Sequence, residues 1–320
     1  MSVSLLGAWA ATGFAIAVPA AWLLLVLFRR SGIRQRAYED APSTHRSKTG
    51  TPTMGGLVFL VVFLAAGAIA RFALVPELVF LILVCGGIGA IDDTLGILHG
   101  TNRGLRARTK FLGTALVAAI FLRAISAAPG FFPLDTLFHA GTVWLVVPHW
   151  LWLLLGILAI TGTIHAVNLT DGLDGLATGT ILPPLVVLAL VAAWLPMPAA
   201  AGLAAAGVGA CAGFLLFNLH PAKLFMGDTG SLALGALLSG VAILTGEMLL
   251  LVLIGGVFVI EALSVMLQVA YFKATGGKRI LAMSPLHHHF EVSGWPETRV
   301  TLRFWLASLL CSLLGWAIVR

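Results

Sequence analysis

The sequence has few charged residues. Only 10% of its 320 residues are Asp, Glu, Lys or Arg, whereas soluble domains contain roughly 25%, and no polar segment is long enough to fold alone. These deficits exclude an ordinary water-soluble protein and a separate soluble domain. Cysteine is scarce too, and Cys85, Cys211 and Cys311 lie far apart in apolar runs. That placement suggests neither a disulfide framework nor a zinc-ligand spacing, so we predict packing residues.

Apolar sequence is abundant instead. Hydrophobic residues make up 59% of the chain, and the mean hydropathy is +1.02. A membrane span needs ~20 mostly apolar residues. By this criterion ten runs are candidates: Leu5–Phe28, Gly55–Phe72, Leu78–Ile91, Phe111–Ala127, Val143–Thr163, Leu176–Leu195, Ala199–Phe217, Ser231–Thr245, Met248–Phe272 and Thr301–Val319. We predict an all-α polytopic integral membrane protein with about ten transmembrane helices and one domain over residues 1–320. The first run lacks the features of a cleaved signal peptide, so we expect it to be retained.

Basic residues are distributed unevenly along the chain. All but three of the 19 Lys and Arg residues follow the first, third, fifth, seventh or ninth run, the exceptions being Arg71, Arg123 and Arg320. Because short cytoplasmic loops are enriched in Lys and Arg, we predict that these loops face the cytoplasm and that both termini lie on the outer side. The remaining candidate groups fall in the same loops, which predicts an active site on the cytoplasmic face. Membrane lipids, and no nucleic acid, are the expected surroundings.

Asp92 and Asp93 end the third apolar run as two adjacent carboxylates. Like charges at the mouth of a span raise each other's pKa and are poorly solvated. They need a cation, but no Lys or Arg lies between Arg71 and Arg103. A loop in water is the simple alternative. We favour a metal-binding or catalytic pair.

Two basic segments are candidate phosphate contacts. Residues 45–56 place Lys48 before small and hydroxyl residues at a helix start, where free backbone N–H groups suit an anion. A capped helix start with a topological lysine explains the segment equally well. Residues 101–110 form a basic run that ends at Lys110. Its default role is lipid-surface contact, although beside the acidic pair it could hold a phosphate bridged by a metal.

Polar residues recur every three positions after the fifth run, at Asn168, Asp171 and Asp174. On a helical turn this spacing would align them on one face, while Gly172 and Gly175 would let a ligand approach closely. An amide and two carboxylates suit ribose hydroxyls, a base edge or a hard cation. An Asp-Gly turn explains one of the two pairs but not both.

Asn218, Phe225 and Asp228 precede the eighth run. Asp228 stands where a helix N-cap would stand. It is equally suited to Mg²⁺, which takes one or two protein carboxylates together with waters and substrate phosphates. The two roles remain open on these residues alone.

Three consecutive histidines, His287, His288 and His289, lie in the last inner loop. Three histidines can bind a transition metal, but consecutive side chains point apart in regular structure. We therefore favour hydrogen bonds or charge donation to phosphate. Glu261, an acid deep in the ninth run, is predicted to make a hydrogen bond between helices.

These segments together resemble a known family. Five motifs carry the likeness in matching order: residues 48–56 (KTGTPTMGG), 92–93 (DD), 168–175 (NLTDGLDG), 225–231 (FMGDTGS) and 285–291 (PLHHHFE). They resemble the bacterial phospho-N-acetylmuramoyl-pentapeptide-transferases, a branch of the polyprenyl-phosphate N-acetylhexosamine-1-phosphate transferase family. The likeness runs from about residue 45 to residue 305, and ten spans with both ends outside agree with that family. The last motif resembles the muramoyl-pentapeptide branch rather than the N-acetylglucosamine branch.

The resemblance implies transfer of phospho-MurNAc-pentapeptide from its UDP carrier to undecaprenyl phosphate, which yields lipid I and UMP in peptidoglycan synthesis at the bacterial inner membrane. It further implies Mg²⁺ at Asp228 and a role for Asp92 and Asp93 in orienting or deprotonating the lipid phosphate or in assisting the metal. Phosphate contacts are implied for Lys48, Lys110 and His287, and a nucleotide side for Asn168, Asp171, Asp174, Asn218 and Phe225, with His288 and His289 as further binding residues. A homodimer is compatible with these expectations.

One position departs from the family pattern. The family has a lysine three residues after the second aspartate, whereas this chain has Gly96. Arg103, Arg106 or another cation replaces that charge, or phosphate affinity is lower. Two other functions stay open at this point: an N-acetylglucosamine-1-phosphate transferase with the same lipid acceptor, and a transporter of an anionic solute.

Overall fold

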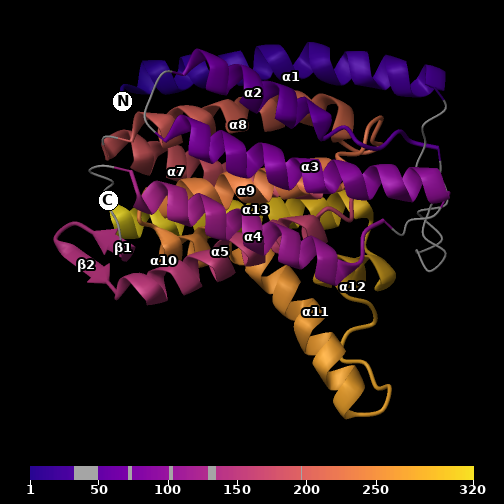
Figure 1. The fold of residues 1–320 in the computed structure, drawn as a ribbon. Coiled ribbons are helices and arrows are strands. Elements are labelled where there is room, and N and C mark those ends of the chain that lie inside the picture. The colour runs from indigo at the N-terminus through magenta and orange to yellow at the C-terminus, as the bar shows by residue number, and fades with distance from the viewer. Residues whose placement is uncertain (32–49, 71–73, 101–103, 129–134, 196) are drawn as a thin grey trace.

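The computed structural model describes residues 1–31, 50–70, 74–100, 104–128, 135–195 and 197–320. Within these ranges the chain is predominantly helical (Figure 1). The helices are α1 (Val3–Ser31), α2 (Leu57–Ile69), α3 (Val75–His99), α4 (Ala107–Ser126), α5 (His149–Thr170), α6 (Leu176–Thr180), α7 (Leu182–Trp194), α8 (Pro198–Asn218), α9 (Gly227–Leu244), α10 (Met248–Ile254), α11 (Gly256–Ala274), α12 (Leu286–Val292) and α13 (Glu297–Val319). Two short strands, β1 (Thr136–Ala140) and β2 (Val143–Val146), complete the described elements.

The prediction of a polytopic helical membrane protein is confirmed. Among the described residues nine helical segments are long and apolar enough to cross a membrane, and α2 is a shorter apolar helix. The sixth predicted run is divided into α6 and α7 beside Pro183 and Pro184, and the ninth is divided into α10 and α11 at Gly255. Proline removes a backbone donor and glycine weakens a helix interior, which explains both interruptions.

The fifth predicted run begins too early. Residues 143–146, assigned to that span from hydropathy, form β2, which pairs antiparallel with β1 in a two-stranded hairpin. The helix starts only at His149, after Pro148. Pro148 cannot donate a backbone hydrogen bond, and it favours the first turn of a helix or the position before it. The fold is therefore helical with one small hairpin.

Helix α9 is the centre of the bundle. It contacts α2, α3, α5, α7, α8 and α10, and every residue from Thr229 to Leu244 is buried. Its sequence is rich in Gly, Ala and Ser, which lets neighbouring helices approach closely in a membrane. Helices α3 and α9 approach closely in this way at Gly89 of α3, where a side chain would collide with the backbone of Asp228.

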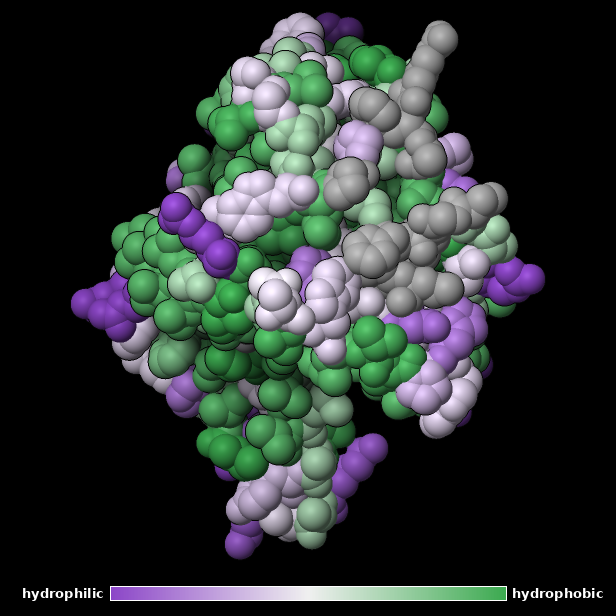
Figure 2. Space-filling view, turned by 90° about the vertical axis from the view of Figure 1, so that its left-hand side faces the viewer, coloured by the Kyte–Doolittle hydropathy of each residue, from purple (hydrophilic) through white to green (hydrophobic). Residues whose placement is uncertain are grey.

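The outer surface of the bundle is apolar. Large exposed side chains on α11 include Ile260, Leu263, Met266 and Leu267. Figure 2 shows hydrophobic residues along the lower projection of the molecule and hydrophilic residues at its tip. The basic residues Lys273, Lys278 and Arg279 follow in this part of the chain. Apolar flanks that end in basic residues are expected for helices in lipid.

The two ends of the bundle differ. Both termini and the β1–β2 hairpin lie at the left-hand end in Figure 1, whereas the C-terminal ends of α1 and α3 and helix α12 lie at the right-hand end. The three cysteines are free thiols in the described structure, and Cys85 and Cys211 are buried in the core. Their predicted packing role is confirmed for these two, while Cys311 is half-buried.

Candidate active site

Asp92, Asp93 and Asp228 converge at one point between α3 and α9. Each offers a carboxylate oxygen within 4.8 Å of the others. The acidic pair does not lie in a loop as predicted, because α3 continues past the apolar run to His99. The backbone contact at Gly89 brings this extended end of α3 against the first turn of α9. Two helices thus bring together carboxylates that lie 135 residues apart in sequence.

Asp93 caps helix α9 from outside that helix. Its carboxylate accepts the backbone N–H groups of Asp228 and Thr229, each at 3.0 Å, and the hydroxyl of Thr229 at 2.6 Å. The first N–H groups of a helix lack partners within the helix, and a carboxylate there interacts favourably with the helix dipole. Asp228 itself is not the N-cap, which is Met226. The capping role considered for Asp228 therefore belongs to Asp93.

Asp228 has two polar neighbours from other helices. Lys110 of α4 donates from Nζ to Asp228 Oδ2 at 2.6 Å, and Asn168 of α5 donates from Nδ2 to Asp228 Oδ1 at 2.8 Å. The same ammonium group lies 3.3 Å from Asp92 Oδ1. The cation that the acidic pair requires is therefore supplied by Lys110, and the three charged side chains are only 13–21% exposed.

The segment after α3 folds back over Asp92. The backbone N–H of Leu105 donates to Asp92 Oδ1 at 2.6 Å, and a side chain at Gly104 would collide with this carboxylate. Gly96, where the family has lysine, is half-buried within α3. Arg106 is exposed at the N-cap of α4, and Arg103 lies outside the described residues. Lys110 is thus the described cation that contacts the acidic cluster directly.

His165 is a neighbour of the cluster to which the sequence analysis assigned no role. Its Nε2 lies 3.1 Å from the Thr114 hydroxyl, which donates to the Lys110 carbonyl at 3.0 Å, and its ring stacks on Phe111. These contacts fix the turn of α4 that carries Lys110. The four-residue spacing of Lys110 and Thr114 was the only available sequence signal, and it does not identify His165.

The prediction that Asn168, Asp171 and Asp174 share one helical face is wrong. Helix α5 ends at Thr170, with Asp171 as its C-cap, so the three residues do not continue one helix. Asn168 faces Asp228, whereas Asp174 is buried and accepts hydrogen bonds from Ala222 N at 2.9 Å and His220 Nδ1 at 3.1 Å. Gly175, with a φ of +70°, permits the turn that separates Asp174 from the helix.

Asp174, His220 and Glu297 form a second polar cluster. Their ligand atoms also lie within 4.8 Å of one another. His220 Nδ1 lies between the two carboxylates, 3.1 Å from Asp174 and 3.5 Å from Glu297. Glu297 accepts the Asp174 backbone N–H at 2.6 Å. This cluster ties the turn after α5 to the start of α13.

Asn218 and Phe225 frame the loop that leads to Asp228. Asn218 is buried: it accepts from the Thr178 hydroxyl at 2.8 Å and donates to the Leu224 carbonyl at 3.0 Å. Phe225 is half-buried, and its backbone pairs with Pro52 at 2.9 Å and Gly55 at 2.8 Å. Asn218 thus shapes the loop, and its predicted contact with a nucleotide stays a prediction, as does ring stacking by Phe225.

The three histidines have three different partners. His287 donates its backbone N–H to Glu261 Oε1, and its Nδ1 lies 3.1 Å from Glu261 Oε2, with both side chains buried. His288 Nδ1 lies 3.1 Å from Glu291, and His289 accepts from Ala282 N at 3.2 Å. The interhelical hydrogen bond predicted for Glu261 is present, between α11 and α12.

His287 Nε2 lies against Gly172. It is buried and has no hydrogen-bond partner within the described residues. A side chain at position 172 would collide with it. Because the Glu261 carboxylate accepts a hydrogen bond from Nδ1–H of His287, Nε2 carries a lone pair that is unused beside the turn that follows α5. Of the remaining predicted residues, Lys48 lies outside the described residues.

Comparison with known proteins identifies close relatives. Residues 75–246 match the family model described as glycosyl transferase family 4, and residues 48–60 match signature 1 of phospho-N-acetylmuramoyl-pentapeptide-transferase. Proteins of that name from Geobacillus kaustophilus and Bacillus subtilis are 44% and 42% identical to this chain. The first match covers 95% of both proteins, and the second covers 95% of this chain and 94% of the relative. A relative of the same name from Frankia casuarinae is 43% identical over 90% of this chain and 89% of its own length.

Proposed function

Since this chain belongs to the phospho-N-acetylmuramoyl-pentapeptide-transferase family, we propose that it transfers phospho-MurNAc-pentapeptide from a UDP carrier to undecaprenyl phosphate. The products are lipid I and UMP. The chain is an enzyme and a multi-pass membrane protein. The observation that carries the reaction is the convergence of three carboxylates, a lysine and an amide from four helices at one end of the bundle.

The reaction exchanges one pyrophosphate bond for another. A phosphate oxygen of the lipid attacks the sugar-linked phosphorus of the UDP carrier, the bond between the two phosphates of UDP breaks, and the electron pair leaves with UMP. Reactant and product bonds are similar, so the protein acts on the barrier by positioning the two phosphates in line and by neutralising charge on the leaving group. Lys110, held by the turn with Thr114, is placed to contact phosphate in this way.

The acidic cluster fits a magnesium ion. Its donors are carboxylate oxygens, and Mg²⁺ prefers hard oxygen ligands with room for phosphate and water. We assign Asp228 as the principal ligand and Asp92 as the second. Asp93 accepts three hydrogen bonds from the first turn of α9, two of them from backbone N–H groups, whereas both partners of Asp228 are side chains that can move when an ion binds. When bound, the ion supplies charge neutralisation at the pyrophosphate. Asp93 acts by holding the first turn of α9 in place.

The other side chains divide by their location. Asn168 orients Asp228 and Glu261 orients His287. We propose that His287 Nε2 meets a phosphate oxygen, and that Phe225, Asp171 and Asp174 lie on the nucleotide side. Lys48 and the pair His288 and His289 complete the proposed phosphate and substrate contacts. Asn218 supports the nucleotide side through its bond to the Leu224 carbonyl.

The proposed orientation places the acidic cluster at the cytoplasmic face of the inner membrane. The supporting observation is that both termini lie at the opposite end from α12 (Figure 1), together with the concentration of Lys and Arg in the loops of the active-site end. We further propose that residues 1–320 form one domain, since the site draws on helices from α3 to α12.

The test uses purified protein in detergent with undecaprenyl phosphate. Radiolabelled UDP-MurNAc-pentapeptide should give labelled lipid and stoichiometric UMP, whereas labelled UDP-N-acetylglucosamine should give neither. Transfer of N-acetylglucosamine instead would assign the chain to the other branch. Because detergent leaves no compartments, release of UMP also excludes transport as the sole activity, whereas uptake into sealed vesicles without UMP would refute the proposal.

A further inference from the structure

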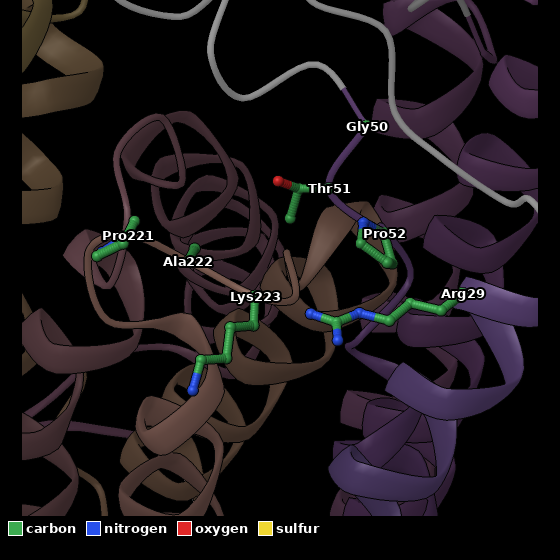
Figure 3. Close-up of a pocket in the computed structure, with 7 residues that line it drawn as sticks. All are labelled: Arg29, Gly50, Thr51, Pro52, Pro221, Ala222 and Lys223. Carbon is green, nitrogen blue, oxygen red and sulfur yellow. The ribbon is translucent and has the colours of Figure 1, made fainter.

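A cavity beside the proposed active site has no part in the mechanism above. Its volume is about 590 Å³, and it lies between the end of α1 and two loops (Figure 3). The lining residues are Arg29, Gly50, Thr51, Pro52, Pro221, Ala222 and Lys223. A cavity of this size falls within the range of ordinary ligand sites. Its walls are two short backbone segments that each contain a proline.

Two cations line this cavity, which we call the Arg29–Lys223 pocket. Arg29 extends from α1 toward the loop that carries Lys223 (Figure 3). Within the described residues neither side chain has an ion-pair partner, in contrast to Lys110 at the acidic cluster. Two like charges that line one cavity attract an anion, and Arg in particular matches a carboxylate or phosphate through two parallel hydrogen bonds. The chemistry of the pocket is therefore that of an oxyanion site.

The side chain of Arg29 is exposed, but its position on α1 continues the helix face that packs into the bundle. One turn earlier on α1, Leu25 occupies the same face and is 7% exposed, because residues four apart lie one above the other on a helix. Helix α1 packs against α8 along this face. The guanidinium group therefore reaches over the end of the bundle toward the loop after α8, and not outward into lipid. This placement favours an anion from the aqueous side over a lipid headgroup.

Hydrogen bonds along one loop connect the pocket to the acidic cluster. Phe225 donates its backbone N–H to the Pro52 carbonyl at 2.9 Å, and Lys223 donates to the Phe217 carbonyl at 2.8 Å. Ala222 donates to the buried carboxylate of Asp174 at 2.9 Å. The same loop then continues to Asp228. A ligand that spans both places would meet walls whose relative positions are held by these hydrogen bonds.

The two places are close enough for a short peptide to bridge them. Lys223 lies five positions before Asp228, so the two residues are at most about 18 Å apart along the backbone. A pentapeptide attached to a sugar through its amino end has the same maximum reach and ends in a free carboxylate. We propose that the Arg29–Lys223 pocket binds a carboxylate of the peptide carried by the UDP-linked substrate. This inference rests on the proposed function.

The experiment compares two donor substrates in the UMP-release assay: UDP-MurNAc-pentapeptide and UDP-MurNAc without peptide. For Arg29→Ala and Lys223→Ala we expect the KM of the pentapeptide substrate to rise about 5-fold each, as for exposed charge pairs, and about 20-fold in the double variant. The KM of the peptide-free substrate, the KM of undecaprenyl phosphate and kcat should not change. Arg30→Ala is the matched control, since Arg30 is exposed on the same turn but does not line the pocket. Arg29→Lys should restore part of the affinity.

Three results would overturn the proposal. An equal rise in KM for both donor substrates would place the anion elsewhere on the nucleotide sugar. A rise confined to undecaprenyl phosphate would assign the pocket to a lipid phosphate. Unchanged KM values for all substrates in the double variant, with an unaltered size-exclusion profile, would leave the pocket without a substrate role. Failure of the proposed function is distinguishable, because the wild-type protein would then release no UMP from either donor.

Discussion

Asp93 accepts both the hydroxyl and the backbone N–H of Thr229, at 2.6 and 3.0 Å, so an acid of α3 holds the first turn of α9. Asp228 stands in that turn. The two adjacent aspartates consequently have different roles: Asp92 forms an ion pair with Lys110, and Asp93 holds the backbone of the helical turn that carries Asp228. This division separates two residues that are equivalent in sequence.

Asp93→Asn is expected to lower both stability and activity. Both oxygens of Asp93 accept hydrogen bonds, and the NH₂ group that replaces one of them in Asn cannot accept. Loss of a charged helix cap lowers the free energy of unfolding by about 1–2 kcal/mol. Thr229→Val removes one donor and should give a smaller loss of the same kind. The measurements are thermal aggregation in detergent and the rate of UMP release. If Asp93 only transferred a proton, activity would fall at unchanged stability, and Thr229→Val would match wild type.

Asp228→Ala is expected to abolish Mg²⁺-dependent transfer while the protein still inserts into the membrane. Loss of the principal metal ligand should lower the rate of UMP release by at least about 100-fold, comparable to loss of one group that stabilises transition-state charge. Titration calorimetry should show weaker Mg²⁺ binding. Asp135→Ala, which removes an aspartate paired with His149 near the hairpin, is the control and should keep wild-type activity. Wild-type activity in Asp228→Ala would remove the metal assignment.

Lys110→Met tests whether this lysine contacts the substrate phosphate or only neutralises the carboxylates. Its ammonium group lies 2.6 Å from Asp228 and 3.3 Å from Asp92, so its removal takes a competing charge away from the carboxylates. We expect Mg²⁺ to bind several-fold more tightly and transfer to fall by about 100-fold, because phosphate loses a cation. Transfer that recovers fully at higher Mg²⁺ would show that the lysine only neutralises the carboxylates.

Glu261→Gln tests whether a buried acid positions His287. The two oxygens of Glu261 accept hydrogen bonds from the backbone N–H and from Nδ1 of His287. Gln replaces one of these oxygens by an NH₂ group, which donates instead of accepting, so the ring loses its fixed orientation. We expect kcat to fall about 10- to 100-fold with little change in KM. The double variant with His287→Gln should be no slower than His287→Gln alone, because the two residues act as a unit. Additive losses would show that Glu261 acts independently of His287.

We expect the stability of the protein to depend on pH through Glu247, at the opposite end of the bundle. This carboxyl lies between α9 and α10, is fully buried, and burial raises its pKa to about 8. Its nearest titratable neighbour is His139, whose Nε2 lies 3.2 Å away and also 3.0 Å from the Thr245 carbonyl. Within the described residues neither carboxylate oxygen has a hydrogen bond of good geometry.

The sign follows from proton binding. Below pH 4.5 the group is protonated in both states, and above that value the unfolded chain releases a proton that the folded protein keeps. Stability should therefore fall between pH 5 and 8, by about 1.4 kcal/mol per pH unit from this group. Glu247→Gln should flatten the profile and raise the melting temperature at pH 7.5. A variant that melts below wild type at pH 7.5 would show that Glu247 is ionised and paired with His139.

Several features of the site were predictable from the sequence. Asp92, Asp93 and Asp228 could be named because charged residues beside long apolar runs are costly and rarely occur without a function. Glu261 could be assigned a hydrogen bond for the same reason. The geometry of consecutive side chains predicted that the three histidines point in different directions, and the structure gives them different partners.

Other features depended on contacts between distant segments. The three-residue spacing of Asn168, Asp171 and Asp174 suggested one face, but the helix ends at Thr170 and the chain turns. Residues 143–146 are as apolar as a span, yet they form a strand. Local hydropathy and spacing do not report where a helix ends when glycine and proline permit a turn.

By itself the sequence determined that this chain resides in a membrane as a multi-helix protein and which family it belongs to, because burial of apolar residues and short motifs are local properties. Tertiary structure alone decided that Asp93 caps α9, that Lys110 joins Asp92 to Asp228, and that Arg29 and Lys223 face one cavity. Each of these relationships depends on which helices pack together, and packing is set by the whole set of side chains that fill the space between them.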